Sequence, residues 1–182
     1  MTKLSREVFK KAALVMIDLQ SGIFARNPNL EPYTVEDIIR RNVDLAQVFS
    51  ENKLPVALVT VGRPNFTEEE RAIFSTIVPE LEVFLKTDKV ETFMKYEPSA
   101  MSIVELKDWL QKEGVETIFL SGVVTSNGVA ATADDAHQAG YQLIIIEDAM
   151  SSKSSADHYQ YIEQHFPEYA KIVTTEDVIE SI

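Results

Sequence analysis

The sequence predicts an α/β protein with a three-layer, doubly wound sheet of about six parallel strands and helices on both faces. Short apolar runs alternate along the chain with segments of helical periodicity, which is typical of βαβ units. Most of these runs are continuously apolar, as expected of strands buried on both faces of a parallel sheet. The chain has 182 residues, the size of one domain, and we expect residues 1–182 to form a single domain.

Six short segments are predicted as strands, and all but the third are mostly β-branched or aliphatic. They are residues 13–18, 56–60, 90–94, 117–121, 142–146 and 171–174. In a doubly wound sheet, ligands bind beyond the carboxyl ends of the strands, at the point where the strand order reverses. The residues that follow each strand are therefore the candidates for a functional site.

Amphipathic helices are predicted between the strands. Residues 35–52 and 103–113 carry apolar side chains mostly at spacings of three and four. Thr34 and Asp37 are a predicted capping pair for the first helix, and Gly114 is expected at the C-cap of the second.

A third helix is expected to run to Ala139 and to end at Gly140. Its predicted N-cap is either Ser126 or Asn127.

The composition excludes several classes of function. The chain has no cysteine, which excludes disulfides, thiolate metal sites and a cysteine nucleophile. A formal net charge of -12 disfavours a nucleic-acid partner, because affinity for nucleic acid depends largely on Lys and Arg at the phosphates. No apolar run approaches the length of a membrane span and no signal-peptide core is present, so we expect a cytoplasmic protein without a membrane partner.

Two charged residues at predicted strand ends are candidates for chemistry. Asp18 ends a buried apolar strand, where desolvation raises the pKa of a carboxyl group, so it is a candidate acid or base. The alternative is a structural role for Asp18, as a cap or an ion-pair partner. Lys95 closes the third strand and is expected to reach the same crevice, although a lysine is more often an ordinary surface charge.

A third feature is the segment 121–129, which runs from a strand through a turn of small residues into an alanine-rich helix. Such a strand-turn-helix aims backbone N–H groups at one point. The spacing matches neither a dinucleotide-binding loop nor a P-loop, so a hole for an oxyanion or a carboxylate fits better than a phosphate site.

The combination of these residues resembles the isochorismatase-like hydrolases. The resemblance covers residues 10–152 and rests on Asp18 with Gln20, on Lys95 before Met101, and on the order of two later motifs. The first motif is Gly122-Val123-Val124-Thr125, and the second is Thr132-Ala133-Asp134-Asp135-Ala136 with Gly140-Tyr141. Most of that family uses a triad of Asp, Lys and Cys, and the place of the Cys is taken here by Gly128.

The resemblance implies a particular chemistry. Without a nucleophile at position 128, hydrolysis of an amide through a thioester is excluded. True isochorismatases resemble this chain in having Gly there, and they cleave an enol ether with an acid and water. Asp18 is then the proton donor, while Lys95 stabilises its conjugate base or binds substrate oxygen.

The residues expected to contact the substrate are Gln20, Phe24, Arg63, Arg71, Val124 and Thr125. Phe24 is expected there as part of an apolar wall around the crevice, and the others follow from the resemblance. For Arg71 the alternative is an ion pair with Glu68 on the same helical face, and for Arg63 it is an ordinary surface charge. Isochorismate itself is doubtful as the substrate, because Val124 and Ser126 stand where isochorismatases of this type carry Tyr and His.

Further implications concern the backbone, metals and assembly. A non-proline cis peptide is expected between Val123 and Val124. Nicotinamidases of the superfamily bind a metal through an Asp-x-His motif, whereas this chain has Val61-Gly62-Arg63 there, so no metal or other cofactor is expected. A homo-oligomer is expected because the family commonly associates, with Trp109, Phe74 and Phe84 as candidate interface anchors.

The sequence is therefore compatible with two functions. The first is a metal-independent hydrolase of a small carboxylated or carbonyl substrate, with Asp18 as the acid or base. The second is a catalytically silent binding or regulatory protein with the same fold. The missing cysteine favours the second, and the presence of both Asp18 and Lys95 favours the first, because a buried charge is costly to keep.

Overall fold

The fold of residues 4–182, taken from a computed structural model, is built on a six-stranded parallel sheet in the order β3-β2-β1-β4-β5-β6. The strands are β1 (Ala12–Ile17), β2 (Val56–Val61), β3 (Val90–Lys95), β4 (Thr117–Val123), β5 (Gln142–Ser151) and β6 (Ala170–Val173). The chain winds outwards from β1 to β3, then crosses back to β4 beside β1. The predicted doubly wound α/β class is confirmed, and the strand order reverses between β1 and β4.

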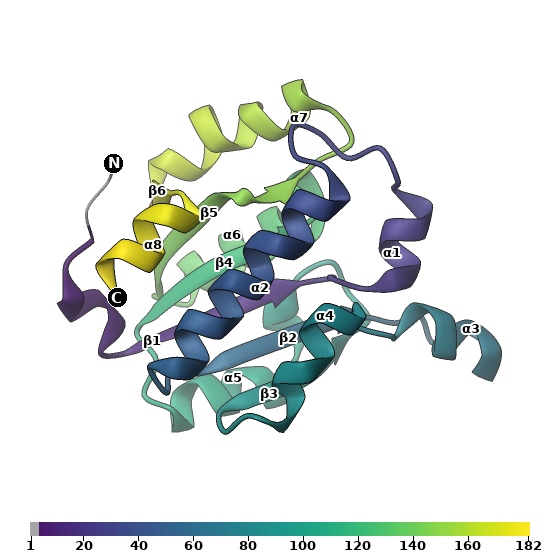
Figure 1. The fold of residues 1–182 in the computed structure, drawn as a ribbon, viewed down its shortest axis with the longest axis horizontal. Helices are drawn as coiled ribbons and strands as arrows, with labels where there is room; N and C mark the ends of the chain where they lie inside the picture. The colour runs from purple at the N-terminus through teal and green to yellow at the C-terminus, as the bar shows by residue number, and fades with distance from the viewer. Residues whose placement is uncertain (1–3) are drawn as a thin grey trace.

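The helices cover both faces of the sheet (Figure 1). They are α1 (Ser21–Arg26), α2 (Val35–Glu51), α3 (Glu68–Phe74), α4 (Pro79–Glu82), α5 (Val104–Lys112), α6 (Ala130–Gln138), α7 (Ser155–Gln160) and α8 (Thr175–Ser181). α2, α4 and α8 pack on one face, while α5, α6 and the segment after α7 pack on the other. None of the helices in residues 4–182 is long and apolar enough to cross a membrane.

Two apolar clusters fix these layers. Side chains of β1 alternate between them, with Leu14 and Met16 in the cluster under α2, and Val15 and Ile17 in the cluster under α5 and α6. All six residues of β1 are buried, because this strand is covered on both faces. β3 lies at the edge of the sheet and only its first and last residues, Val90 and Lys95, are buried, which explains its weaker apolar pattern.

Most helix ends lie where the sequence predicts them. Thr34 caps α2 by accepting a hydrogen bond from the Asp37 N–H, as predicted. The predicted N-cap of α6 was wrong: Thr125–Val129 form a π-helical turn (η4) that leads into α6 without a side-chain cap. The Ser126 hydroxyl is engaged elsewhere, because it donates to the Asp157 carboxylate at 2.5 Å.

The switch point between β1 and β4 is closely packed. Gly122 has a φ of 113° and pairs with Ile17, and a Cβ at this position would collide with the Ile17 backbone. Only glycine fits here, because it has no Cβ and tolerates positive φ. Two peptide bonds are cis, Val123–Val124 beside this glycine and Glu31–Pro32.

β5 is longer than the sequence predicts. It continues past Ile146 to Ser151, and its pairing with β4 shifts between Leu120 and Gly122, so that Gly122 lies opposite Met150. Glu147 and Asp148 fall in this irregularity, and their polarity gave the appearance of a strand end. The carboxyl end of β5 therefore lies several residues later than expected.

The three aromatic side chains suggested as interface anchors all pack within the chain. Trp109 lies against the Phe93 ring, Phe84 packs against the cluster under α2, and Phe74 is buried. A homo-oligomer stays a prediction.

Candidate active site

Asp18 directly follows β1 at the centre of the sheet. Its φ is 56°, a left-handed conformation that Asp and Asn adopt more readily than most residues. Its N–H donates to the Val59 carbonyl at 2.8 Å, which extends the pairing of β1 with β2 and fixes the start of the loop. The residue is only 8% exposed, so the carboxyl group is held in a nearly dry environment.

Lys95 is the last residue of β3 and reaches Asp18 across the end of β2. Its Nζ lies 3.0 Å from Asp18 Oδ2 and donates to the Pro98 carbonyl at 2.6 Å. The lysine is 2% exposed, which is rare for this residue type without a partner. The Asp18–Lys95 pair therefore joins two strands that are not neighbours in the sheet.

The environment of Asp18 favours its neutral form more than water does. Burial raises the pKa of Asp18 by more than the charge and hydrogen bond of Lys95 lower it, so the pKa rises from 3.8 to about 6. Asp18 Oδ2 faces the ammonium, whereas the buried Oδ1 has no hydrogen-bond partner in the described structure. Near pH 6 the group therefore exists in both protonation states.

Gly128 lies against this pair from the η4 turn. A Cβ built on Gly128 would stand 3.0 Å from Lys95 Nζ and 3.2 Å from Asp18 Oδ2. The backbone is held in place by Thr132, whose hydroxyl donates to the Gly128 carbonyl and accepts from the Ala100 N–H. The space that a nucleophilic side chain would occupy here opens directly onto the charged pair.

These three residues line a cavity of about 410 Å³ at the carboxyl ends of the strands. Phe66 and Phe74 form an aromatic wall, with ring centroids 4.8 Å apart. Tyr96 and Val124 also line the cavity. Its size is typical of a site for a small organic molecule.

The structure brings some of the expected substrate contacts to this cavity and leaves others away from it. Arg63 and Val124 line it, as do Asp18, Lys95 and Gly128. Arg71 is exposed, does not line it, and donates from Nε to the Phe66 carbonyl.

Three other expected contacts are buried outside the cavity lining. The Gln20 side chain binds backbone groups of Val61 and Phe74 and thereby ties the loop after β1 to β2 and α3. Phe24 packs in the apolar cluster under α2. The Thr125 hydroxyl lies 2.9 Å from Nδ1 of the buried His158. Side chains next to a strand end point in different directions, and their hydrogen-bond and packing partners decide which of them face the cavity.

Two cationic residues of the cavity were missed by sequence reasoning. Arg26, at the end of α1, stacks over the Phe74 ring, with Cζ 3.9 Å from the ring centroid. Lys153 follows the carboxyl end of β5 and also lines the cavity. The rule that sites follow strand ends would have found Lys153 if β5 had been assigned its full length.

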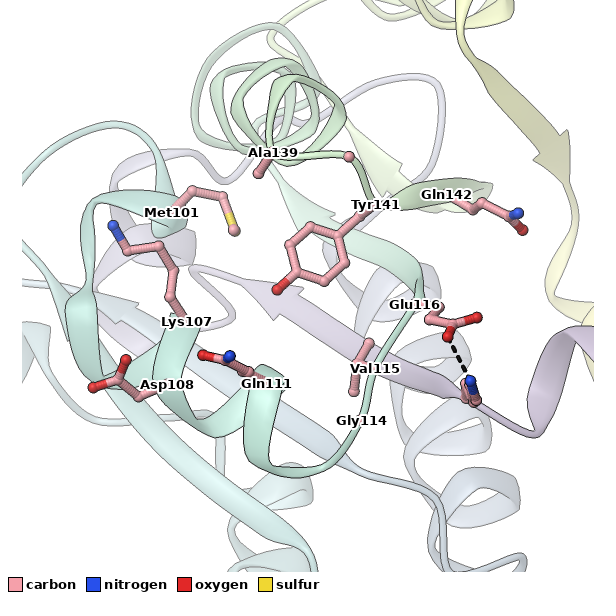
Figure 2. A pocket seen from close by; sticks show the side chains of 12 residues that line it. Met101, Lys107, Asp108, Gln111, Gly114, Val115, Glu116, Ala139, Tyr141 and Gln142 are labelled. Atoms are coloured by element: carbon pink, nitrogen blue, oxygen red, sulfur yellow. Dashed lines mark hydrogen bonds and ion pairs between the residues drawn. The ribbon is translucent and has the colours of Figure 1, made fainter.

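A second, larger cavity of about 680 Å³ lies at the opposite end of the sheet (Figure 2). Its lining includes Lys11, Glu116 and Gln142, at the starts of β1, β4 and β5. Lys11 and Glu116 form an exposed ion pair there. Because open parallel sheets bind ligands at the carboxyl ends of their strands, the cavity beside Asp18 is the candidate active site.

The fold and the site together define a class of protein: a doubly wound α/β protein with an Asp–Lys pair in a cavity at its switch point. A family model described as "Isochorismatase domain" matches residues 12–177. The chain therefore belongs to the isochorismatase family, whose members are hydrolases. Within residues 4–182, no group of three or more His, Cys, Asp or Glu side chains is arranged to hold a metal ion.

Individual relatives are similar over most of their length. The chain is 31% identical over 186 residues to the uncharacterized isochorismatase family protein YecD of Escherichia coli O157:H7, covering 95% of this chain and 97% of YecD. It is also 31% identical over 189 residues to the uncharacterized isochorismatase family protein YwoC of Bacillus subtilis, covering 96% and 95%. A shorter match, 29% identical over 84 residues, links 46% of the chain to 39% of the maleamate amidohydrolase of Pseudomonas putida.

Solved structures show the same architecture. An isochorismatase family protein from Burkholderia thailandensis superimposes with a TM-score of 0.83 at 26% identity, over 94% of this chain and 95% of that one. A putative hydrolase of the family from Chromobacterium violaceum also gives 0.83, at 20% identity, over 100% and 97%. Because this second structure is only 20% identical, its similarity shows the fold alone.

Proposed function

We propose that the protein is a metal-independent hydrolase of a small carboxylated or carbonyl substrate, with Asp18 as the acid–base group and no covalent nucleophile. The observation that carries the proposal is the Asp18–Lys95 pair, at 3.0 Å, beside a Gly128 that contributes no side chain. An acid whose pKa is about 6 donates and accepts protons effectively near neutral pH. Enol-ether cleavage requires such an acid and water, whereas amide hydrolysis by the usual route of the family requires a nucleophile.

The proposed reaction begins with protonated Asp18. Oδ1 carries the proton, because Oδ2 accepts from Lys95. Transfer of this proton to the terminal vinyl carbon of an enol ether leaves an oxocarbenium-like centre at the carbon that bears the ether oxygen. Water adds to that centre and gives a hemiketal, which releases the alcohol and leaves a ketone. The proton released by the water restores Asp18.

Lys95 has two roles in this scheme. Its ammonium stabilises the Asp18 carboxylate that forms in the first step. Its hydrogen bond to the Pro98 carbonyl keeps the ammonium fixed, so that little reorganisation accompanies the proton transfer. Arg63 and Val124 are the proposed substrate contacts among the residues expected from the sequence, because both line the cavity.

The acid role predicts the direction of the pH dependence. With 2-methoxyacrylate, the methyl enol ether of pyruvate, kcat/KM should fall about tenfold per pH unit above about pH 6, because only protonated Asp18 donates. Pyruvate formation is measured from about pH 5 to about pH 8, with EDTA present to test metal independence. If kcat/KM for the enol ether instead rises with pH through about pH 6, the acid role is contradicted. If kcat/KM for ammonia release from succinamate shows that rise, Asp18 acts as a base on an amide.

Gly128→Ala tests whether the space beside the pair is where the substrate reacts. The new methyl group would crowd Lys95 Nζ and Asp18 Oδ2, so kcat/KM should fall about tenfold, as expected of a misplacement of several tenths of an ångström. The melting temperature should change little, because the residue lies in a helical turn and the crowded atoms are side-chain ends. An unchanged kcat/KM would place the reaction elsewhere.

The alternative proposal is a catalytically silent, ligand-binding member of the family. The absence of a side chain at Gly128 favours it, because most of the chemistry of the family depends on a nucleophile there. Binding without turnover of any enol ether or small amide would support this alternative over the hydrolase.

A further inference from the structure

His158 is a buried titratable residue that the proposed reaction does not use. It lies in α7, its side chain is fully buried, and its Nδ1 lies 2.9 Å from the Thr125 hydroxyl. Its Nε2 has no hydrogen-bond partner within residues 4–182, and the nearest Glu147 carboxylate oxygen is 3.8 Å away. A polar ring with an unsatisfied nitrogen is a costly way to fill an apolar space, so packing alone does not explain a histidine here.

The surroundings of the His158 ring decide its orientation and its tautomer. The rings of Tyr33 and Tyr159 contact it edge-on, with centroids 5.9 and 5.1 Å away. The Tyr33 hydroxyl donates to the same Glu147 oxygen that faces Nε2, which holds this carboxylate in place. A carboxylate beside Nε2 favours a hydrogen on that nitrogen, so Nδ1 is the acceptor and the Thr125 hydroxyl donates to it. His158 is therefore a fixed acceptor for Thr125.

Thr125 is the first residue of the η4 turn, whose start has no side-chain cap. The turn is fastened from α7 instead: His158 accepts from Thr125, and Asp157 accepts from Ser126, the next residue. Three residues after Thr125, the turn places Gly128 directly against the charged pair of the site. Two consecutive residues of α7 therefore hold the start of the turn that carries Gly128.

We propose that His158 is a positioning residue for the reaction at Asp18. Its hydrogen bond with Thr125 fixes the η4 turn, and with it the distance between the Gly128 backbone and the charged pair. The inference rests on the proposed function for the step that it accelerates, whereas the fixing of the turn does not depend on turnover. His158 is not among the residues that line the cavity, so it acts through the turn and touches no reacting atom.

Steady-state kinetics with 2-methoxyacrylate separate positioning from a general loss of stability. His158→Leu and Thr125→Val each remove one half of the hydrogen bond and roughly keep the side-chain volume. Each should lower kcat about tenfold, as expected of a misplacement of several tenths of an ångström, and change KM less than about twofold. The double variant should be no worse than either single variant, because both exchanges remove the same interaction.

Conservative variants test whether the bond to Thr125 is what matters. His158→Asn keeps a polar atom close to the place of Nδ1, so it should restore most of kcat, whereas His158→Gln places its amide nearer to Nε2 and should act like His158→Leu. This contrast between two amides of similar size stays informative if the Leu variant fails to fold. His165→Leu is the matched control, because His165 also follows α7 but lies 2.7 Å from Asp134 on α6, and it should keep full kcat.

Nuclear magnetic resonance tests the position of the turn without turnover. The chain has six glycines, so labelling with ¹⁵N-glycine gives few amide signals, and Gly128→Ala identifies that of Gly128 by its loss. In His158→Leu and Thr125→Val the Gly128 signal should shift, and that of Gly114, which follows α5 at the opposite end of the sheet, should not. His158→Asn should return the Gly128 signal towards its wild-type position.

The proposal is overturned if the Leu and Val variants keep the wild-type kcat, if their losses add in the double variant, or if the Gly128 signal stays in place. Its failure is distinguishable from failure of the hydrolase. A Gly128 signal that responds as expected, in a protein that turns over nothing, would support the fixing of the turn and leave the hydrolase without support. Asp18-dependent turnover that is insensitive to His158 would do the reverse.

Discussion

Asp18→Asn is expected to lower kcat/KM for the enol ether about a thousandfold, within the usual contribution of a general acid. The amide has no proton that it can donate at neutral pH, although it fills the same space. Asn also tolerates the left-handed backbone at this position, where φ is 56°, and its Oδ1 can accept from Lys95. The fold should therefore persist, and the loss should lie in the chemical step.

Far-ultraviolet circular dichroism and the melting temperature test the fold of the variant, and pyruvate release tests its activity. Asp108→Asn is a suitable control, because Asp108 lines the cavity at the other end of the sheet and the exchange is chemically identical (Figure 2). The control should retain full activity. Turnover by Asp18→Asn at the wild-type rate would contradict the acid role of Asp18.

Lys95→Met is expected to have the largest effect on stability. The exchange keeps the length of the side chain but leaves the Asp18 carboxylate buried without its partner, which costs about 3 kcal/mol in the free energy of unfolding. It also removes the group that lowers the pKa of Asp18, so that pKa should rise above about 6. The falling limb of the pH profile should then move to higher pH, at a reduced kcat.

The pH dependence of stability gives a second measurement on this variant. Because the pKa of Asp18 is higher in the folded state than in the unfolded state, its contribution to stability is complete below about pH 4 and is lost as pH rises through about 6. In Lys95→Met this loss should extend to higher pH, since the folded-state pKa is higher still. Urea unfolding at a series of pH values measures the difference.

Lys11→Met is the control for Lys95→Met. Lys11 also pairs with a carboxylate, that of Glu116, but its side chain is 61% exposed. Exposed ion pairs contribute about 0–1 kcal/mol, so this exchange should change stability little and activity not at all. Equal effects of the two exchanges would show that burial of the Asp18–Lys95 pair is not what matters.

The fold class and the central pair were predictable from the sequence. Apolar runs alternating with helical periodicity indicate a parallel sheet, and all strands of such a sheet present their carboxyl ends at one edge. Asp18 and Lys95 each end a predicted strand, which is enough to place them at the same edge. Their direct contact depends on the strand order, because Lys95 must reach across the end of β2.

The rest of the site was decided by the tertiary structure. Gln20 and Thr125 also follow strand ends, three residues after β1 and two residues after β4, yet their side chains are engaged by backbone groups and by His158. Lys153 reaches the cavity because β5 continues through an irregularity that its polar residues conceal. Local sequence sets where strands begin and which residues are apolar, whereas the direction of each polar side chain depends on partners supplied by distant segments. The position of the Arg26 guanidinium also depends on a distant segment, because Phe74, the ring on which it stacks, lies 48 residues further along the chain.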